Sequence, residues 1–254
     1  MRTADHEMPQ VRAATRAHYE QYPFIEGGQR RIDLWRSRMA VFLPDALIRG
    51  AWVLDVGASV GEVARSLADR GARVTCIDLT ATATRRCRVL HQTINVVQAD
   101  ALALPFRNAS FDHSVAIGVL HHTPDCARGL REMTRVTRPG GTLTVLLYNR
   151  WTPYHVLYTM TARIRRRWTA DAVDGLPGWV KAVIRLGLRI QTGLRLDDEL
   201  MKRLIADQVW TPQATFHTRH EVERWAGEIG LRLLKRKVIP FYSTIFMFVR
   251  DGAR

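Results

Sequence analysis

The sequence predicts an α/β protein with a doubly wound, mostly parallel, seven-stranded sheet of the Rossmann-like type. Short apolar runs alternate with helical segments from residue 52 to residue 147, and this alternation is typical of a parallel sheet that helices cover on both faces. Two more apolar runs flank residues 240–243, and we expect them to pair as an antiparallel hairpin at one edge of the sheet. The hydrophobic fraction of 46% over 254 residues is enough to fill the core of one large domain.

The first part of the chain, residues 1–50, is expected to be a helical attachment that lies outside the sheet. Residues 9–20 mix Arg, Ala, His and Tyr as a short helix does, and the Tyr-Pro-Phe sequence at 22–24 ends this helix. A second amphipathic stretch spans residues 31–42. Both stretches precede the first convincing strand, so we expect them to cover the sheet as part of a lid.

The rest of the chain divides into the sheet and one insertion. The expected strands span residues 52–56, 73–77, 94–98, 113–117, 142–147, 233–239 and 244–249. Residues 51–147 therefore form the α/β core, and residues 206–254 complete it. Between them, residues 148–205 change to helical segments rich in arginine, at 159–168 and 179–194. We expect this insertion to form a second part of the lid.

The net charge of +14 leaves two kinds of ligand open. A strongly basic chain is often one that binds nucleic acid. However, nearly all of the positive charge is arginine, because only four of the 38 basic residues are lysine, and a biased base composition of the genome produces the same excess. The charge alone therefore does not decide between a nucleic-acid ligand and a small molecule.

The cysteines and the apolar segments limit the location and the metal content. The three cysteines, at positions 76, 87 and 126, have no Cys-x-x-Cys spacing, so we expect neither a disulfide framework nor a metal site. No uninterrupted apolar run reaches the length of a membrane span, and the N-terminus lacks the apolar segment of a signal peptide. The expectation is a cytoplasmic protein without a membrane span.

The first motif with chemical content is the sequence VLDVGASVGE at residues 53–62. An apolar strand enters a loop of small residues, and the loop opens into a helix. Glycines at such a turn let the backbone approach a ligand closely, and the helix N-terminus offers unpaired N–H groups. A tight connection in any doubly wound domain has a similar sequence, so this loop needs support from other motifs.

The supporting motifs follow in order along the chain. Asp78 ends the next strand about 20 residues beyond the glycines, where a carboxylate can accept hydrogen bonds from ribose hydroxyls. A nicotinamide-dependent dehydrogenase shares this feature, so the later motifs discriminate. They are QADA at 98–101 with LPF at 104–106, FD at 111–112, VLHH at 119–122 and RPGG at 138–141.

In this order and spacing, the motifs resemble the class I S-adenosylmethionine-dependent methyltransferases, a broad group whose small-molecule members include enzymes of ubiquinone and menaquinone biosynthesis. The resemblance covers about residues 51–147, with weaker support from 221–249. It implies the cofactor S-adenosyl-L-methionine, the product S-adenosyl-L-homocysteine and methyl transfer to a small molecule, as in a biosynthetic pathway. The RPGG turn resembles the family's usual entry to the fifth strand.

The resemblance also implies roles for single residues. The loop at 55–61 would hold the methionine part, Asp78 the ribose and Asp100 the adenine amino group, and residues 117–120 would border adenine and the methionyl chain. The residues expected at the cofactor are Asp55, Gly57, Ala58, Ser59, Gly61, Asp78, Leu79, Asp100, Ala101, Ile117 and Gly118. Ser59 departs from the family's usual Gly-x-Gly-x-Gly loop, because it occupies the middle glycine. A serine fits there without strain if its φ is negative, and it costs free energy if the loop needs a positive φ.

The acceptor and the catalytic residues are less defined. A sulfonium methyl group is already activated, so in-line displacement requires mainly alignment and the exclusion of water. A hydroxyl or acidic-carbon acceptor would also benefit from a general base. The candidate catalytic residues are His121, His122, Tyr22, His155 and His217, although the paired histidines can equally serve in packing. Acceptor recognition is expected where the N-terminal stretch with Tyr19, Tyr22 and Phe24 meets the insertion with Tyr148, Asn149, Trp151, Tyr154 and His155.

Two other functions stay open at this point. An RNA methyltransferase is the first, because Arg163, Arg165, Arg166 and Arg167 stand beside Trp168 and suit phosphate contact and base stacking. A solvated helical face would have the same composition, and the chain has neither an appended RNA-binding module nor an Asn-Pro-Pro-Tyr type motif after the fourth expected strand. A non-catalytic protein that binds S-adenosylmethionine is the second, with only Ser59 as a sign of a damaged site. The sequence does not set the oligomeric state.

Overall fold

The computed structural model describes residues 4–23, 28–162, 174–192 and 196–252. Its sheet has seven strands in the order β3-β2-β1-β4-β5-β7-β6. The strands are β1 (Trp52–Val56), β2 (Arg73–Asp78), β3 (Asn95–Gln98), β4 (Phe111–Ile117), β5 (Thr137–Tyr148), β6 (Leu231–Ile239) and β7 (Ser243–Arg250). Strands β1 to β5 pair in parallel, whereas β7 pairs antiparallel with both β5 and β6. The fold class predicted from the sequence is therefore confirmed.

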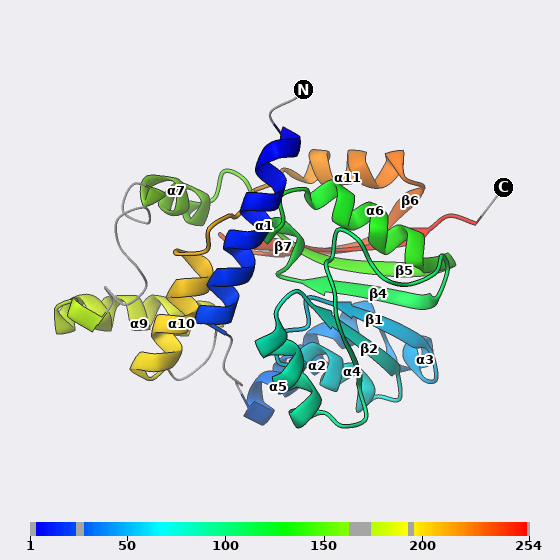
Figure 1. Cartoon of the computed structure of the whole chain (residues 1–254), viewed down its shortest axis with the longest axis horizontal. Helices are drawn as coiled ribbons and strands as arrows, with labels where there is room; N and C mark the ends of the chain where they lie inside the picture. Colours follow the sequence, from blue (N-terminus) through cyan, green and yellow to red (C-terminus); the bar gives the residue numbers. More distant parts are fainter. Residues whose placement is uncertain (1–3, 24–27, 163–173, 193–195, 253–254) are drawn as a thin grey trace.

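Helices cover both faces of the sheet and one of its ends (Figure 1). They are α1 (Ala4–Gln21), α2 (Gly28–Phe42), α3 (Asp45–Ile48), α4 (Glu62–Ala68), α5 (Ala81–Leu90), the 3-10 helix η1 (Leu120–His122), α6 (Cys126–Val136), α7 (Pro153–Met160), α9 (Gly178–Thr192), α10 (Asp198–Gln208) and α11 (Arg219–Glu228). Figure 1 shows α6 and α11 on one side of the sheet and α2, α4 and α5 on the other. Helices α1, α7, α9 and α10 gather on the left of that view, beside the sheet.

The core consists of two apolar layers, one on each face of the sheet. Leu54 and Val56 of β1 belong to the layer with Met133 of α6, whereas Val53 belongs to the layer with Leu67 of α4. Successive side chains of a strand point to opposite faces, so a strand that is covered on both faces is apolar at nearly every position. This explains why the parallel strands read as continuous apolar runs in the sequence.

The RPGG segment differs from its predicted role as a turn that precedes the fifth strand. Strand β5 already begins at Thr137, which pairs with Phe111, and the next paired residues are Thr142 and His113. Residues 138–141 are therefore extra residues within the strand, and they form a bulge against β4. The prediction of a strand that starts at residue 142 was wrong, because the glycines accommodate a bulge without ending the strand.

The expected insertion is helical where it is described. It contains α7, α9 and α10, and Leu188, Met201, Leu204 and Ile205 form a small apolar cluster between α9 and α10. Phe24 and the arginine cluster at 163–168 lie outside the described residues.

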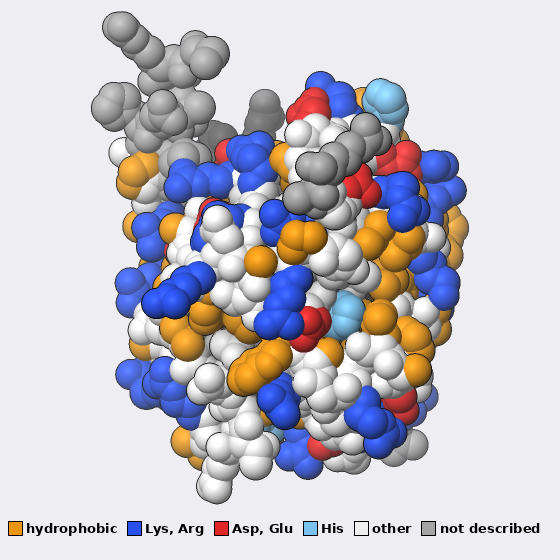
Figure 2. Space-filling model, turned by 90° about the vertical axis from the view of Figure 1, so that its right-hand side faces the viewer, with side chains coloured by type: hydrophobic (Ala, Val, Ile, Leu, Met, Phe, Trp, Pro, Cys, Tyr) orange, Lys and Arg blue, Asp and Glu red, His pale blue; other side chains and the backbone are white. Residues whose placement is uncertain are grey.

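Two features concern the possible partners: the distribution of basic side chains on the surface, and the length and apolar character of the helices. Figure 2 shows Lys and Arg side chains scattered over one face of the molecule, with hydrophobic and acidic groups between them. The basic residues of that face therefore do not form one continuous patch. Within the described part of the chain, no helix is both long and apolar enough to cross a membrane.

Candidate functional site

Two pockets lie side by side and share the loop that follows β1. The first, which we call the α1 pocket, is lined by Thr15, Tyr19, Gly57, Ser59, Asp78, Asp100, Gly118 and His122 among others. The second, the α2 pocket, is lined by Arg31, Trp35, Arg38, Asp55, Gly57, Ser59, Gly118, Tyr148, Asp207 and Tyr242 among others. Gly57, Ser59 and Gly118 line both pockets. The two pockets therefore meet at the carboxyl ends of β1 and β4, where open α/β sheets bind their ligands.

The loop between β1 and α4 has an unusual backbone. Gly57, Ser59 and Gly61 have φ values of +70°, +52° and +83°. A Cβ atom at Gly57 would overlap the side chain of Val119, and one at Gly61 would lie 2.7 Å from Sγ of Cys87. Glycine is therefore required at both positions. Ser59 has the positive φ at which we expected a serine to be strained.

Asp78 connects this loop to the end of β2. Its Oδ2 accepts a hydrogen bond of 3.0 Å from the backbone N–H of Ser59, and its Oδ1 accepts bonds of 2.9 and 2.8 Å from the backbone N–H and the hydroxyl of Thr80. Burial raises the pKa of Asp78, and these three hydrogen bonds oppose the shift. A carboxylate has about four acceptor positions, so one remains on Oδ2 for a ligand hydroxyl in the α1 pocket.

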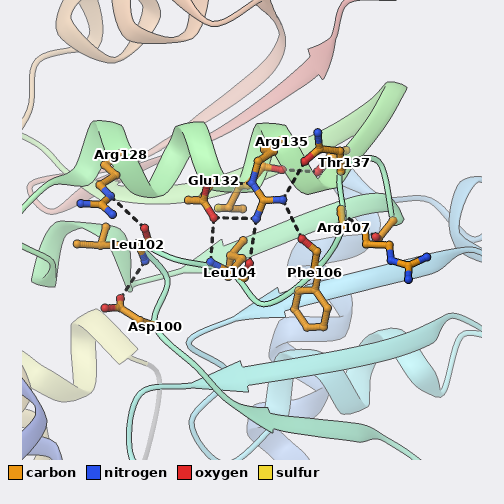
Figure 3. A network of polar contacts seen from close by, with 12 residues as sticks. Asp100, Leu102, Leu104, Phe106, Arg107, Arg128, Glu132, Arg135 and Thr137 are labelled. Carbon is orange, nitrogen blue, oxygen red and sulfur yellow. Dashed lines mark hydrogen bonds and ion pairs between the residues drawn. The ribbon is translucent and has the colours of Figure 1, made fainter.

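Asp100 lies after β3, in a segment that α6 holds in place. Its Oδ1 accepts a hydrogen bond of 2.9 Å from the backbone N–H of Leu102, and its Oδ2 lies 2.8 Å from Nε of Arg12 in α1. Figure 3 shows how Arg128, Glu132 and other α6 side chains bind the backbone of this segment. The position of Asp100 is therefore fixed from two sides before any ligand is considered.

The same network reaches further along the segment. Arg135 donates hydrogen bonds of 2.9 and 2.8 Å to the carbonyl oxygens of Leu104 and Phe106, and Glu132 accepts one of 2.8 Å from the N–H of Leu104 (Figure 3). Arg135 and Glu132 also pair with each other at 2.9 Å. One ion pair thus satisfies backbone groups at residues 104 and 106 of an irregular segment, and residues 99–101 at the start of this segment line the α1 pocket.

Asp55 is a buried acid with an unsatisfied oxygen. It lies at the carboxyl end of β1 and lines the α2 pocket, and its buried Oδ2 has no hydrogen-bond partner in the described part of the chain. Burial raises the pKa of Asp55 to about 8, and the negative charge of Asp78 adds to this shift. A buried carboxyl group without a partner costs free energy, so this position suits a cationic group of a ligand. Gly118 is open as well, because a Cβ atom there would meet nothing within 4 Å.

Helix α1 closes the α1 pocket from outside. The carboxylate of Glu20 accepts hydrogen bonds of 2.7 and 3.2 Å from the N–H groups of Ala81 and Thr82 at the N-terminus of α5. Tyr19 donates a hydrogen bond of 3.0 Å to Asp207 of α10. Together with the Arg12–Asp100 pair, these contacts connect α1 to α5, to α10 and to the segment that follows β3. Figure 1 shows α1 running beside α10.

The paired histidines occupy different environments. His121 is fully buried and stacks on Tyr148 with ring centres 3.6 Å apart. Burial lowers its pKa well below the usual value, so this ring is neutral and packs in the core. His122 lines the α1 pocket, and its Nδ1 lies 2.8 Å from the carbonyl oxygen of Gln213, which fixes the proton on that nitrogen. Burial also lowers the pKa of His122, although the negative charge of Asp207 acts in the opposite direction.

Three predicted catalytic residues are not at these pockets, which corrects their expected position. His155 and His217 line a third, shallower pocket, with Arg150 and Phe216. His155 packs on Phe216 with ring centres 4.6 Å apart. Tyr22 packs on His18 at the end of α1 and lines neither the α1 pocket nor the α2 pocket.

The predicted cofactor residues, in contrast, come together. Gly57, Ser59, Asp78, Leu79, Asp100, Ala101 and Gly118 line the α1 pocket, and Asp55, Ala58 and Ile117 line the α2 pocket. Gly61 lines neither, and it serves the conformation of the loop.

Several residues of the α2 pocket were not singled out from the sequence, among them Arg31, Trp35, Arg38 and Asp207. Arg31, Trp35 and Arg38 stand at a spacing of four and three residues, which places them on one face of α2. The sequence alone was therefore enough to predict that these three side chains share one face of a helix. No sequence pattern marked Asp207, because its position in the pocket depends on how α10 packs.

Comparison with known proteins bears on the identity of this domain. Residues 54–145 match a family of proteins described as "Methyltransferase domain". A demethylmenaquinone methyltransferase of Beutenbergia cavernae is 37% identical over 112 residues, which cover 43% of this chain and 46% of that protein. Methyltransferase GfsG of Streptomyces halstedii is 36% identical over 130 residues, which cover 48% and 45%. The chain thus spans about half the length of the curated relatives it matches.

Solved structures resemble the chain over nearly its whole length. A 1,6-didemethyltoxoflavin-N1-methyltransferase of Burkholderia thailandensis, solved with 1,6-didemethyltoxoflavin and S-adenosylhomocysteine, gives a TM-score of 0.60 at 14% identity and covers 97% of this chain and 90% of that one. The magnesium protoporphyrin IX methyltransferase of Synechocystis gives 0.58 at 15% identity, with 97% of each chain covered. At such identities the likeness shows the fold alone. Residues 54–145 therefore resemble a methyltransferase domain in sequence, and the chain as a whole has the fold seen in S-adenosylmethionine-dependent methyltransferases.

Proposed function

We propose that this chain transfers a methyl group from S-adenosylmethionine to a small-molecule acceptor. The observation that carries the proposal is the set of three carboxyl groups, Asp55, Asp78 and Asp100, which lie at or just after the carboxyl ends of β1, β2 and β3 and line two pockets that meet at the β1 loop. S-adenosylmethionine, when bound, supplies a methyl group on a positively charged sulfonium. Acids around a cationic donor suit its charge, although the chain as a whole is basic.

Each part of the donor has a matching group in the protein. The free acceptor position of Asp78 suits a ribose hydroxyl, and Asp100 suits the amino group of adenine. The unsatisfied Oδ2 of Asp55 suits the cationic methionine end, near the glycines of the β1 loop. Helix α1 would exclude water from the α1 pocket, which favours displacement at the methyl group.

The α2 pocket suits a small organic acceptor. Trp35, Tyr148, Tyr242, Leu146 and Leu204 supply aromatic and aliphatic walls, and a few polar groups stand among them. Ligand sites for small molecules have this composition. The relatives named for demethylmenaquinone and for toxoflavin methylation support the same class. The described residues offer no comparable support for RNA as the acceptor.

The proposal is tested by incubating the purified protein with S-adenosylmethionine labelled in the methyl group. One reaction receives a small-molecule extract and another receives total RNA. We expect label in the small-molecule fraction and none in RNA above a reaction without protein. Label in RNA alone would overturn the small-molecule proposal, and binding of the donor without any transfer would favour a non-catalytic protein.

Asp78→Ala should weaken the binding of S-adenosylhomocysteine by roughly 1.5–3 kcal/mol, the scale of a hydrogen bond to a charged group. Isothermal titration calorimetry measures this change. Asp198→Ala is the matched control, since the Asp198 side chain is 68% exposed and lies outside both pockets. NAD should not bind the parent protein. Unchanged affinity in a folded Asp78→Ala variant would exclude the assigned ribose contact.

The binding of S-adenosylmethionine should become tighter as the pH rises toward 8. Burial raises the pKa of Asp55 to about 8, so the free protein holds a proton there at neutral pH. A cationic donor stabilises the carboxylate and lowers this pKa, so binding releases the proton below pH 8 and not above it. Calorimetry in buffers of different ionisation enthalpy counts the released proton. Asp55→Asn should abolish the part of the pH dependence that Asp55 causes, and an unaltered profile in this variant would contradict the assignment.

Ser59→Gly should retain the binding of the donor within a factor of ten and stabilise the fold by at most about 1 kcal/mol. The substitution relieves a positive φ of +52° at a non-glycine residue, while the added freedom of the unfolded chain offsets part of the gain. Chemical denaturation measures the stability, and calorimetry the affinity. A loss of more than tenfold in affinity would mean that the serine hydroxyl binds the donor directly.

A further inference from the structure

Asp207, in the last turn of α10, has a carboxylate oxygen available to the α2 pocket. Its Oδ1 accepts the hydrogen bond of 3.0 Å from the hydroxyl of Tyr19. For Oδ2, the described part of the chain provides no hydrogen-bond donor and no ion pair. Asp207 lines the α2 pocket and keeps part of its surface open, although the chain surrounds it closely. The free oxygen can therefore reach a group that is bound in the pocket.

The surroundings of Asp207 do not neutralise its charge. The titratable and charged groups that face it are Tyr19 of α1, Arg31 of α2, His122 of η1, Tyr148 of β5, Tyr154 of α7 and Tyr242. Arg31 already pairs with Glu62 at 2.5 Å, and burial keeps His122 neutral. Burial raises the pKa of Asp207, and its place at the negative end of the α10 dipole acts in the same direction.

Such a carboxylate is costly for the fold. An acid that lies deep in the chain without a dedicated cation loses hydration that its single tyrosine donor only partly replaces. Helix α10 nevertheless places it in the α2 pocket beside the proposed donor site, and Tyr19 of α1 holds it there. A role in the reaction explains this position, and packing alone does not.

We infer that Asp207 is the general base of the methyl transfer and that the acceptor is an aromatic molecule with a hydroxyl or acidic-carbon proton. The inference rests on the proposed function. In the step, Oδ2 of Asp207 takes the acceptor's proton while the acceptor's electron pair forms the bond to the methyl carbon. The carbon–sulfur bond breaks with its pair on sulfur, and the proton later leaves Asp207 for solvent.

A second charged residue of the α2 pocket, Arg38, supports the same class of acceptor. Arg38 lies with its guanidinium carbon 5.2 Å from the ring centre of Trp35, and no acidic partner for it occurs among the described residues. Burial lowers the pKa of Arg38, and the nearby charge of Arg31 adds to the shift, so this cation lacks compensation. An acceptor that becomes anionic as it loses its proton would supply the missing charge. A neutral amine needs neither this cation nor the base.

The test uses two probes with the same aromatic ring system, 1-naphthol and its methyl ether 1-methoxynaphthalene, added to the protein saturated with S-adenosylhomocysteine. Calorimetry should show that 1-naphthol binds the parent more tightly, because only its hydroxyl can donate to Asp207. Asp207→Asn should weaken the binding of 1-naphthol about tenfold, since a charge-assisted hydrogen bond becomes a neutral one. The affinity for S-adenosylhomocysteine should stay unchanged. Asp198→Asn, on the same helix and exposed, should behave as the parent.

The pH dependence separates a base from a merely structural acid. The affinity of the parent for 1-naphthol should rise with pH as Asp207 loses its proton, at a pH above the usual range for aspartate. Tyr19→Phe removes the donor that stabilises this carboxylate, so the rise should move to higher pH. Asp207→Asn should lack the rise.

The outcomes distinguish the inference from the proposed function. If the parent fails to bind S-adenosylhomocysteine, the proposed function fails. If it binds S-adenosylhomocysteine but not 1-naphthol, or if the affinity for 1-naphthol is unaffected by Asp207→Asn and by pH, the role of Asp207 is contradicted.

Discussion

The loop between β1 and α4 fixes the geometry of both pockets. Gly57, Ser59 and Gly61 adopt positive φ angles, so the chain turns sharply at the carboxyl end of β1. The hydrogen bond from the N–H of Ser59 to Asp78 then ties this turn to the end of β2. Because Gly57 and Ser59 line both pockets, a displacement of the loop would move the proposed donor and acceptor sites together. The other residues that line the two pockets surround this turn.

A second constraint is electrostatic. The carboxyl groups of Asp55, Asp78 and Asp207 lie deep in the chain, and burial raises the pKa of each one. The free-energy cost of burying these three carboxyl groups falls in one region, where the two pockets meet. Asp78 accepts three hydrogen bonds and Asp207 accepts one from Tyr19, whereas Oδ2 of Asp55 has no partner among the described residues. The unsatisfied oxygens suit the cationic donor and the acceptor proton that we propose. The separate tasks that we propose for the acids are consistent with these different hydrogen bonds.

The sequence was sufficient for the features that local patterns determine. Alternating apolar runs gave the seven strands, and the acids that end β1 and β2 were recognisable because strand ends in a parallel sheet meet at one edge. Packing between distant segments was not recognisable in this way. Asp207 reaches the pocket only because α10 packs against α1, and His155 is absent from it because α7 directs that residue toward Phe216. The RPGG segment was predicted to be a turn before the fifth strand, but it is a bulge within β5. Glycines are compatible with both structures, so the sequence did not distinguish them.

The central claim is that the two joined pockets hold the donor and the acceptor on either side of the β1 loop. A crystal structure of the protein with S-adenosylhomocysteine tests this claim most directly. We expect adenine beside Asp100, a ribose hydroxyl on Oδ2 of Asp78, and the amino end of the homocysteine part near Asp55, with the part of the α2 pocket around Asp207 and Arg38 still open. A complex in which the nucleoside fills the α2 pocket, or lies away from the β1 loop, would contradict it.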